Sequence, residues 1–175
     1  MTEKTPVEVR RARTSDIPHI ERLISPLVEE RILLGKEKVI LYESVQEFRI
    51  AEDADGTIIG CGALHVMWED LGEVRTLAVD REILGRGVGG QILQTLERDA
   101  IELGLSRLFC LTFEVSFFER NGFLALRDSD GDPVVDSDLY SELVRSPDEG
   151  IAEFLELARV KPNTLGNTRM LKRLF

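Results

Sequence analysis

A glycine-rich turn between an extended run and a helical run constrains this chain more than any other stretch. Residues 72–80 are rich in strand-forming side chains, and residues 81–84 lead from them into four glycines within six positions. From there to Gly104, apolar side chains recur at three- and four-residue steps, which is the spacing of one helix face. The sequence therefore predicts a strand, a short loop and a helix, with the glycines at the helix start.

Glycines at the start of a helix leave its first backbone N–H groups bare, so that a ligand can come close to them. Those N–H groups and the positive end of the helix dipole together favour a phosphate group. We therefore expect residues 85–90 to bind the phosphates of a ligand.

One known phosphate-binding pattern, the dinucleotide fingerprint, fits this turn only in part. Gly85-x-Gly87-x-x-Gly90 has the glycine spacing, and Glu114 lies roughly where a ribose-binding acid would be. That fingerprint should follow its strand directly and usually opens its domain, whereas here residues 81–84 intervene. Two or three extended runs also precede the turn with no crossover helix between them, so a dinucleotide site is disfavoured.

The acetyl-CoA loop of GNAT-type N-acetyltransferases is the better match. Its pattern is Gln/Arg-x-x-Gly-x-Gly/Ala after a strand that ends in an apolar-x-apolar triplet. Residues 84–89, Leu-Gly-Arg-Gly-Val-Gly, resemble the loop and residues 77–79, Leu-Ala-Val, resemble the triplet. The first loop position is Leu84, which loses a side chain but keeps the backbone amides; a turn without a ligand is the remaining alternative. The resemblance implies that acetyl-CoA is the co-substrate and contacts Leu77, Ala78, Val79, Leu84, Gly85, Arg86, Gly87, Val88, Gly89 and Gly90.

Length and composition bound the class of protein. The 175 residues predict a single domain, 1–175, long enough for a real core. The formal net charge of −10 disfavours a nucleic-acid partner, and it requires a local basic cluster for any anionic ligand. There is no apolar run of membrane-spanning length, and the first residues are polar rather than a signal peptide. We therefore expect a cytoplasmic protein with no membrane partner.

The sequence predicts no metal site. Cys61 and Cys110 lie in predicted strands, where buried reduced thiols are favoured over a disulfide or metal ligands. The acidic run 128–132 fails as a calcium loop because Pro133 stands in place of the glycine and Leu139 in place of the final glutamate. We interpret that run as an acidic surface turn.

The other periodicities predict an α/β (α+β) architecture. Residues 14–16 offer helix caps, and Pro26 is expected to shorten the helix that follows them. Two antiparallel hairpin strands, a crossover helix and a parallel continuation give a mixed central sheet flanked by helices, an order similar to the GNAT fold, splayed where acetyl-CoA enters. Strands are predicted over 7–12, 48–52, 57–66, 72–80, 107–112, 123–126 and 168–174, further helices over 17–27, up to Gln46, 116–121 and 136–144, and an extended or mixed segment over 152–160.

Several segments together resemble the acetyltransferase domain of the N-acetylglutamate synthase family. They are residues 32–34 (Ile-Leu-Leu), 47–48 (Glu-Phe), 60–64 (Gly-Cys-Gly-Ala-Leu), 72–79 (Gly-Glu-Val-Arg-Thr-Leu-Ala-Val), 117–123 (Phe-Phe-Glu-Arg-Asn-Gly-Phe) and 167–171 (Asn-Thr-Arg-Met-Leu). Long members of that family carry an arginine-binding kinase-like domain, for which 175 residues leave no room. We therefore expect the short stand-alone form, typical of actinobacteria. The resemblance implies transfer of acetyl from acetyl-CoA to the α-amine of L-glutamate or L-glutamine, the first step of arginine biosynthesis.

The same resemblance proposes the catalytic residues. The family's general base falls on Glu73, for which a carboxylate merely paired with Arg75 is the alternative. Many GNAT enzymes use a tyrosine as the acid, but Phe118 stands at that position here. The synthase branch points instead to a hydroxyl that aligns with Thr112, for which a backbone-bonded strand threonine is an equal alternative.

Substrate carboxylates need cations. Lys36 and Lys38 align with a basic pair of the family, and Arg75, Lys161 and Arg169 can add to it, although each alone is more often a solvated surface charge. His65 falls where the family places a substrate-side polar residue, with a structural sheet histidine as the safer interpretation.

Two other functional classes stay open. One is a GNAT enzyme that acetylates a protein N-terminus or lysine, which the basic residues and the lack of an acidic groove motif disfavour. The other is a non-catalytic acyl-CoA or nucleotide sensor, which would keep residues 85–90 but have no use for Glu73. A homodimer is allowed, and the expected partner is a small amino acid.

Overall fold

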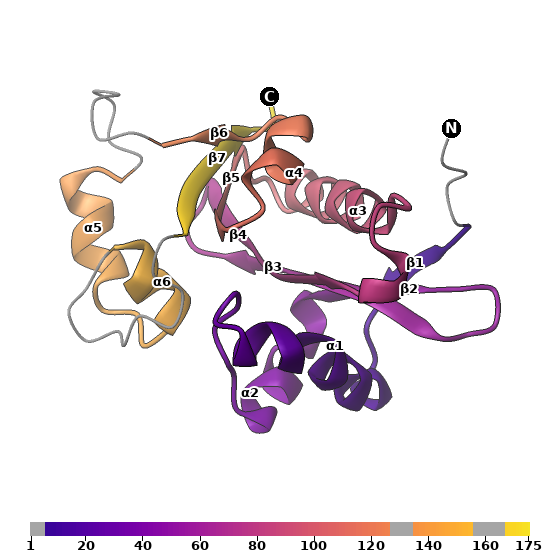
Figure 1. Cartoon of the computed structure of the whole chain (residues 1–175). Coiled ribbons are helices and arrows are strands. Elements are labelled where there is room, and N and C mark those ends of the chain that lie inside the picture. Colours follow the sequence, from indigo (N-terminus) through magenta and orange to yellow (C-terminus); the bar gives the residue numbers. More distant parts are fainter. Residues whose placement is uncertain (1–5, 127–134, 156–166) are drawn as a thin grey trace.

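A mixed sheet organises the molecule (Figure 1). The computed structural model describes residues 6–126, 135–155 and 167–175. Within these residues seven strands form one sheet in the order β1-β2-β3-β4-β5-β7-β6. Only β4 and β5 run parallel, and the other neighbours are antiparallel. The strands are β1 Glu8–Arg11, β2 Phe48–Glu52, β3 Ile58–Val66, β4 Leu71–Val79, β5 Arg107–Thr112, β6 Leu124–Ala125 and β7 Thr168–Arg173.

Helices cover both faces of this sheet, as predicted. Figure 1 shows α3 (Val88–Glu102) and α4 (Val115–Arg120) on one face, and α1 (Ile17–Glu29) and α2 (Lys38–Glu43) on the other. Further along the sheet, α5 (Ser137–Leu143) and α6 (Glu149–Phe154) form a small lobe. Short 3₁₀ turns occupy Thr14–Asp16, Val45–Glu47 and Arg81–Ile83.

Each helical group closes its own apolar core. The core under α3 centres on Ile92, Leu93, Leu96 and Phe123, and the core under α1 centres on Ile17, Ile20, Phe48 and Ile50. A third cluster joins Leu71 and Phe109 of the sheet to Leu143, Ile151 and Phe154 of the α5–α6 lobe. This third cluster positions the N-terminus of α6 beside the middle of β4.

The two parallel strands separate soon after they meet. β4 and β5 pair only over Leu71–Glu73 and Arg107–Phe109, and their remaining residues diverge. On its other side β4 has a bulge, because Gly62 of β3 stands opposite both Thr76 and Leu77. Thr76 there has a φ of 56°, a left-handed conformation that is uncommon for a β-branched residue. The predicted splay is therefore present, and Glu73 is the last residue of β4 that pairs with β5.

Several sequence-based boundaries differ from the structure. Pro26 does not shorten α1, which continues to Glu29; the N–H of Glu30 donates to the carbonyl of Pro26, and the burial of the preceding apolar face supports the helix. The helix predicted to reach Gln46 ends at Glu43, and a 3₁₀ turn follows over Val45–Glu47.

The extended or mixed segment predicted from residue 152 is wrong for residues 152–154, which lie in α6. The Asp148 carboxylate caps that helix by accepting the N–H of Ile151, and Ile151 and Phe154 are buried. The rest of that predicted segment, 156–160, and the acidic run 128–132 lie outside the described residues.

Candidate active site

A cavity of about 710 Å³ opens where β4 and β5 part. Four segments supply its walls: the loop before α2, the middle of β4, the end of β5 and the start of α6. Its lining includes Ile32, Leu33, Leu34, Gly35, Lys36, Glu37, Ile40, Glu73, Val74, Arg75, Thr76, Leu111, Pro147, Asp148, Glu149, Gly150, Glu153 and Asn167. Both cationic and anionic side chains therefore line one open cavity, and most of the charged ones are carboxylates.

A buried carboxylate and a buried guanidinium lie on one face of β4, two residues apart. Glu73 is 4% exposed and Arg75 is 8% exposed. Arg75 Nε donates to Glu73 Oε2 at 2.9 Å, and Arg75 Nη2 donates to the same oxygen. The pairing that the sequence left as an alternative for Glu73 is thus present, and both N–H groups converge on one carboxylate oxygen.

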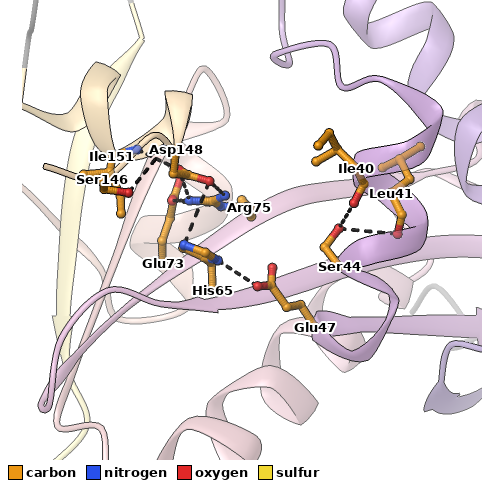
Figure 2. Close-up of polar contacts among 10 residues, drawn as sticks. All are labelled: Ile40, Leu41, Ser44, Glu47, His65, Glu73, Arg75, Ser146, Asp148 and Ile151. Atoms are coloured by element: carbon orange, nitrogen blue, oxygen red, sulfur yellow. Dashed lines mark hydrogen bonds and ion pairs between the residues drawn. The ribbon is translucent and has the colours of Figure 1, made fainter. Parts of the chain in front are cut away.

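The same guanidinium binds a second carboxylate from a distant segment (Figure 2). Arg75 Nη1 and Nη2 donate to Asp148 Oδ2 and Oδ1, each at 2.9 Å. Asp148 is the N-cap of α6, and its Oδ1 also accepts the N–H of Ile151 at 2.9 Å. A Cβ added to Gly150 would lie 2.9 Å from Arg75 Nη2, so a glycine there lets the guanidinium lie against the first turn of α6.

The charges in this cluster are mutually stabilised. Burial opposes the charge on Arg75, but the carboxylates of Glu73 and Asp148 outweigh it and raise the pKa of Arg75 above its ordinary value. Burial likewise opposes the charge on Asp148, but the hydrogen bonds and charge of Arg75 hold the pKa of Asp148 well below its usual range. Asp148 and Arg75 are therefore both ionised at neutral pH.

His65 of β3 links the cluster to Glu47 in the 3₁₀ turn before β2. Its Nδ1 lies 2.8 Å from Glu47 Oε1, and its Nε2 lies 3.9 Å from Asp148 Oδ2. Figure 2 shows His65 between these two acids, of which Asp148 lines the cavity. The histidine that the sequence placed on the substrate side is therefore near the cavity, held by a carboxylate partner.

The predicted substrate-binding lysines separate in the structure. Lys36 lines the cavity, and its pKa is lowered by burial and then by the charge of Arg75, against the opposing pull of nearby carboxylates. Lys38 begins α2, its side chain is 53% exposed, and its Nζ lies 3.7 Å from Glu21 Oε1. Among the described residues that line the cavity, Lys38 does not occur.

Of the other two predicted cations, the structure describes only Arg169, which is not among the described residues that line the cavity. Arg169 of β7 stands opposite Leu111 in the sheet, and its Nη1 donates to the carbonyl of Phe154 at 3.5 Å. Lys161 lies outside the described residues.

Thr112 and Phe118 occupy the β5 side of the opening. Thr112 ends β5, is 8% exposed, and its Oγ1 accepts the N–H of Glu114 at 2.8 Å. A hydroxyl that accepts one hydrogen bond still has its own proton to donate. Phe118 is buried and packs edge-on against Phe117 and Phe123, with ring centroids 5.1 Å apart in each pair, so it acts as a core side chain.

The glycine-rich turn leaves β4 at its far end and opens α3. Gly85 and Gly87 both have a φ of 82°, a conformation that favours glycine, and Gly87 is the N-cap of α3. The N–H of Gln91 donates to the Gly87 carbonyl at 3.2 Å, so the amides of residues 88–90 precede the first α-helical bond. Added Cβ atoms at Gly85 and Gly90 would meet nothing within 4 Å, whereas one at Gly89 would lie 3.4 Å from Phe117.

The remaining predicted cofactor contacts flank this turn. Leu77 and Val79 pack against the core under α3, and Ala78 packs against the core under α1. Leu84 and Arg86 are exposed on the turn itself, and Val88 is buried beneath it. The turn thus presents backbone rather than bulky side chains beyond the splay.

Sequence reasoning missed the part of the site that comes from α6. Asp148 and Gly150 lie more than 70 positions from Arg75 and received no role. An Asp directly before the first residue of a helix, as Asp148 stands before Glu149, is a usable N-cap signal. No sequence signal, however, indicates which cation such a carboxylate will meet.

A splayed mixed sheet with a glycine turn at the end of its central strand defines an acyltransferase-type architecture, and the comparisons with known proteins agree. The profile of the Acetyltransferase (GNAT) family matches residues 20–123. An amino-acid acetyltransferase of Mycobacterium tuberculosis is 52% identical over 165 residues, which are 93% of this chain and 92% of that protein. The chain belongs to the GNAT acetyltransferase family.

Two solved structures are similar over nearly the whole chain. Rv2747 from Mycobacterium tuberculosis, in complex with CoA and NLQ, has a TM-score of 0.88 at 50% identity, with 96% of this chain and 99% of that chain covered. N-acetylglutamate synthase from Neisseria gonorrhoeae, complexed with CoA and N-acetyl-glutamate, has a TM-score of 0.75 at 28% identity. The match covers 99% of this chain and 36% of the gonococcal chain. The family and fold predicted from the sequence are confirmed.

Among residues 6–126, 135–155 and 167–175, two kinds of feature are absent. No helix there is both long and apolar enough to cross a membrane. No group of three or more His, Cys, Asp or Glu side chains there is placed to hold a metal ion. Cys61 and Cys110 are both buried free thiols, and burial raises the pKa of Cys61 to about 12.

Proposed function

We propose that this protein is an acetyl-CoA-dependent amino-acid N-acetyltransferase that acetylates the α-amine of L-glutamate or L-glutamine. The observation that carries the proposal is the placement of the buried carboxylate Glu73 at the parting of β4 and β5, in a cavity that also contains Lys36 and Arg75. An amino-acid acetyltransferase is 52% identical across almost the entire chain, and the N-acetylglutamate synthase neighbour was solved with CoA and N-acetyl-glutamate. Arginine biosynthesis is the pathway these relatives imply.

The acetyl-CoA side of the proposal rests on the glycine turn. The bare amides of residues 88–90 and the start of a 15-residue helix favour the CoA pyrophosphate. Gly85 and Gly90 leave open space where side chains would otherwise stand. The thioester end would then lie between the diverging ends of β4 and β5, close to the cavity.

Acetyl transfer requires an amine that has lost its proton, since the ammonium has no free electron pair. Glu73 accepts that proton, directly or through a water; the amine nitrogen then bonds to the acetyl carbon, the carbon–sulfur bond breaks, and the second proton of the nitrogen passes to the departing thiolate. Both hydrogen bonds from Arg75 end on Oε2 of Glu73, which leaves Oε1 for the proton. Thr112 assists the departing thiolate or positions the thioester, because its hydroxyl proton is not used by Glu114.

The substrate carboxylates are assigned to cations around the cavity. Lys36 is the leading candidate, since it lines the cavity and is partly desolvated there. Arg75 faces the same space but already binds two carboxylates, and His65 stands beside Asp148. Arg169, Lys161 and Lys38 stay predictions, of which Lys38 has the least structural support.

Some expectations from the sequence remain part of this proposal. They are a single domain over residues 1–175, a cytoplasmic location and a small amino acid as the partner. A homodimer is allowed, and sedimentation of the purified chain would test it.

A thiol-release assay with acetyl-CoA and a panel of free amino acids tests the proposed activity. We expect turnover with glutamate or glutamine and little with unrelated amino acids. Turnover with peptides but with no free amino acid would replace the proposal by a protein-acetylating enzyme. Tight acetyl-CoA binding without turnover on any acceptor would favour a sensor.

A further inference from the structure

Two carboxylates share one buried guanidinium at the centre of the site. Arg75 uses Nε and Nη2 for Glu73 on its own strand, and Nη1 and Nη2 for Asp148 on the N-terminus of α6. The three side chains together carry one net negative charge when all are ionised. The positive charge of Arg75 is therefore shared between the proposed base, Glu73, and a second carboxylate.

We propose that Asp148 is a positioning residue that acts on Glu73 through Arg75. By taking half of the guanidinium's contacts and part of its charge, Asp148 keeps Glu73 basic enough to accept the proton of the acceptor amine. This inference rests on the proposed function, in which Glu73 is that base. Asp148 does not itself touch the reacting atoms in this arrangement.

The need for Asp148 follows from the chemistry of the pair. An arginine bonded to a carboxylate favours its ionised form and makes it a weaker proton acceptor. A carboxylate held only by Arg75 would be well positioned but too weakly basic to accept the proton readily. A second carboxylate on the far edge of the guanidinium offsets that charge and leaves the hydrogen bonds to Oε2 of Glu73 in place.

The environment of Asp148 suits a fixed negative charge. Its Oδ1 accepts from both Arg75 and the N–H of Ile151, and its Oδ2 accepts from Arg75 and faces His65. These contacts hold the pKa of Asp148 well below its usual range, so it stays charged where the enzyme would work. Asp148 therefore supplies constant charge and does not compete with Glu73 for the proton.

Other titratable groups surround the cluster and contribute to any pH profile. Lys36 and Glu37 face it from the loop before α2, and Glu149 and Glu153 face it from α6. Glu47 approaches from the 3₁₀ turn before β2, His65 approaches from β3, and Cys110 approaches Glu73 from β5. Lys36 and His65 also interact with the charge of Asp148, so the part of a shift that disappears in an Arg75→Gln background is the part that acts through the guanidinium.

The test uses Asp148→Asn, because asparagine keeps a good N-cap acceptor while it removes the charge and one of the two oxygens that accept from Arg75. Its matched control is Asp136→Asn, which alters the N-cap of α5, where Asp136 accepts the N–H of Leu139 at 2.8 Å. The measurement is kcat against pH at saturating acetyl-CoA, with the amino acid that the wild type uses. We expect the acid limb of Asp148→Asn to move to lower pH by about one unit and its plateau to fall roughly three- to tenfold.

The control should keep the wild-type limb, and both variants should have similar melting temperatures. In an Arg75→Gln background, Asp148→Asn should cause no further shift, because the connecting guanidinium is gone. Asp148→Ser, a second neutral N-cap, should repeat the shift and serves if the asparagine variant folds poorly.

An unmoved acid limb in the neutral variants, with lower thermal stability alone, would show that Asp148 only caps α6. A raised KM for the amino acid with an unmoved limb would make Asp148 a substrate contact instead. Either result overturns the inference. The proposed function still stands in that case if the wild type acetylates its amino acid and Glu73→Gln is impaired. If Glu73→Gln keeps near-native kcat, the base assignment itself has failed.

Discussion

The glycine turn at residues 84–90 and the cluster of Glu73, Arg75 and Asp148 are built in opposite ways. The turn consists of consecutive residues, it offers backbone N–H groups, and its shape follows from glycines with positive φ. The cluster offers side-chain charges and joins β4 to a helix that begins more than 70 residues later. Ligand binding at the turn should therefore be sensitive to added Cβ atoms and tolerant of nearby charge changes. Catalysis at the cluster should be sensitive to charge changes and tolerant of small changes in bulk.

The strongest test of this contrast removes the base charge from the cluster. Glu73→Gln should lower kcat by roughly 10²- to 10⁴-fold, since proton removal from the ammonium loses its acceptor. Acetyl-CoA affinity, which depends on the turn, should hardly change. Steady-state kinetics and calorimetry would measure the two effects, with the exposed Glu69→Gln on the neighbouring hairpin turn as the control. Near-native kcat in Glu73→Gln would place the base elsewhere.

The converse test adds bulk to the turn. Gly87→Val and Gly89→Val should weaken acetyl-CoA binding by about ten- to a hundredfold, as expected for lost hydrogen bonds to a charged phosphate. Gly87 also has a φ of 82°, so Gly56→Val, at a φ of 80° in the β2–β3 turn, controls for backbone strain. Calorimetric titration with acetyl-CoA and with NADH is the measurement. Unchanged acetyl-CoA affinity, or tighter NADH binding, would refute the loop assignment.

A smaller effect should separate the two lysines that the sequence treated as a pair. Lys36→Ala should raise KM for the amino acid by about tenfold with little change in kcat, because it removes a contact made before and during reaction. Lys38→Ala should have a much weaker effect, since its ammonium lies towards Glu21 on the surface. Equal effects of both variants on KM would contradict the structural distinction between them.

The pKa of Lys36 gives this contact a pH dependence. Burial and the charge of Arg75 lower that pKa, so Lys36 loses its proton at a lower pH than an ordinary lysine. Its charge is present below that pKa and lost above it. We expect KM for the amino acid to rise on the alkaline side in the wild type, and this rise to be absent from Lys36→Ala.

The smallest kinetic effect is expected at Thr112, on the far side of the opening. Thr112→Val keeps the shape of the side chain and removes its hydroxyl, so it also removes the acceptor for the N–H of Glu114. Because a hydroxyl is a poor proton donor at neutral pH, kcat should fall by no more than about tenfold. Single-turnover rates at saturating acetyl-CoA would measure this, and unchanged turnover would remove Thr112 from the mechanism.

Most of the scaffold could be predicted because its signals are local. Alternation and helical periodicity placed β2 and β5 at their observed residues and α3 close to its own. The failures occurred where packing outweighed local preference, as at Pro26 inside α1 and at residues 152–154 inside α6. In both cases buried apolar side chains stabilise a helix that local composition argued against.

The residues of the candidate site also differ in how far the sequence alone could predict them. The glycine turn could be found from a local pattern in the sequence, and Glu73 was proposed from the family resemblance of the strand that precedes it. The difference between Lys36 and Lys38 could not, because it depends on which way the loop before α2 faces the cavity. Asp148 could not be assigned either, because its partner is brought to it by the apolar cluster that joins α6 to the sheet.

The sequence by itself therefore determined the family, the order of strands and helices, the phosphate-favouring turn and the carboxylate on the central strand. The turn and the order of elements depend on backbone conformational preferences and on side-chain periodicity, which act between residues that are neighbours along the chain. The family and the carboxylate were given by the resemblance of several segments to known proteins. Only the tertiary structure decided that Arg75 is shared between Glu73 and Asp148, that Lys36 rather than Lys38 faces the cavity, and that His65 stands between two acids. Ion pairs of this kind depend on distances of a few ångströms between separate segments, and those distances exist only after the three apolar cores have packed.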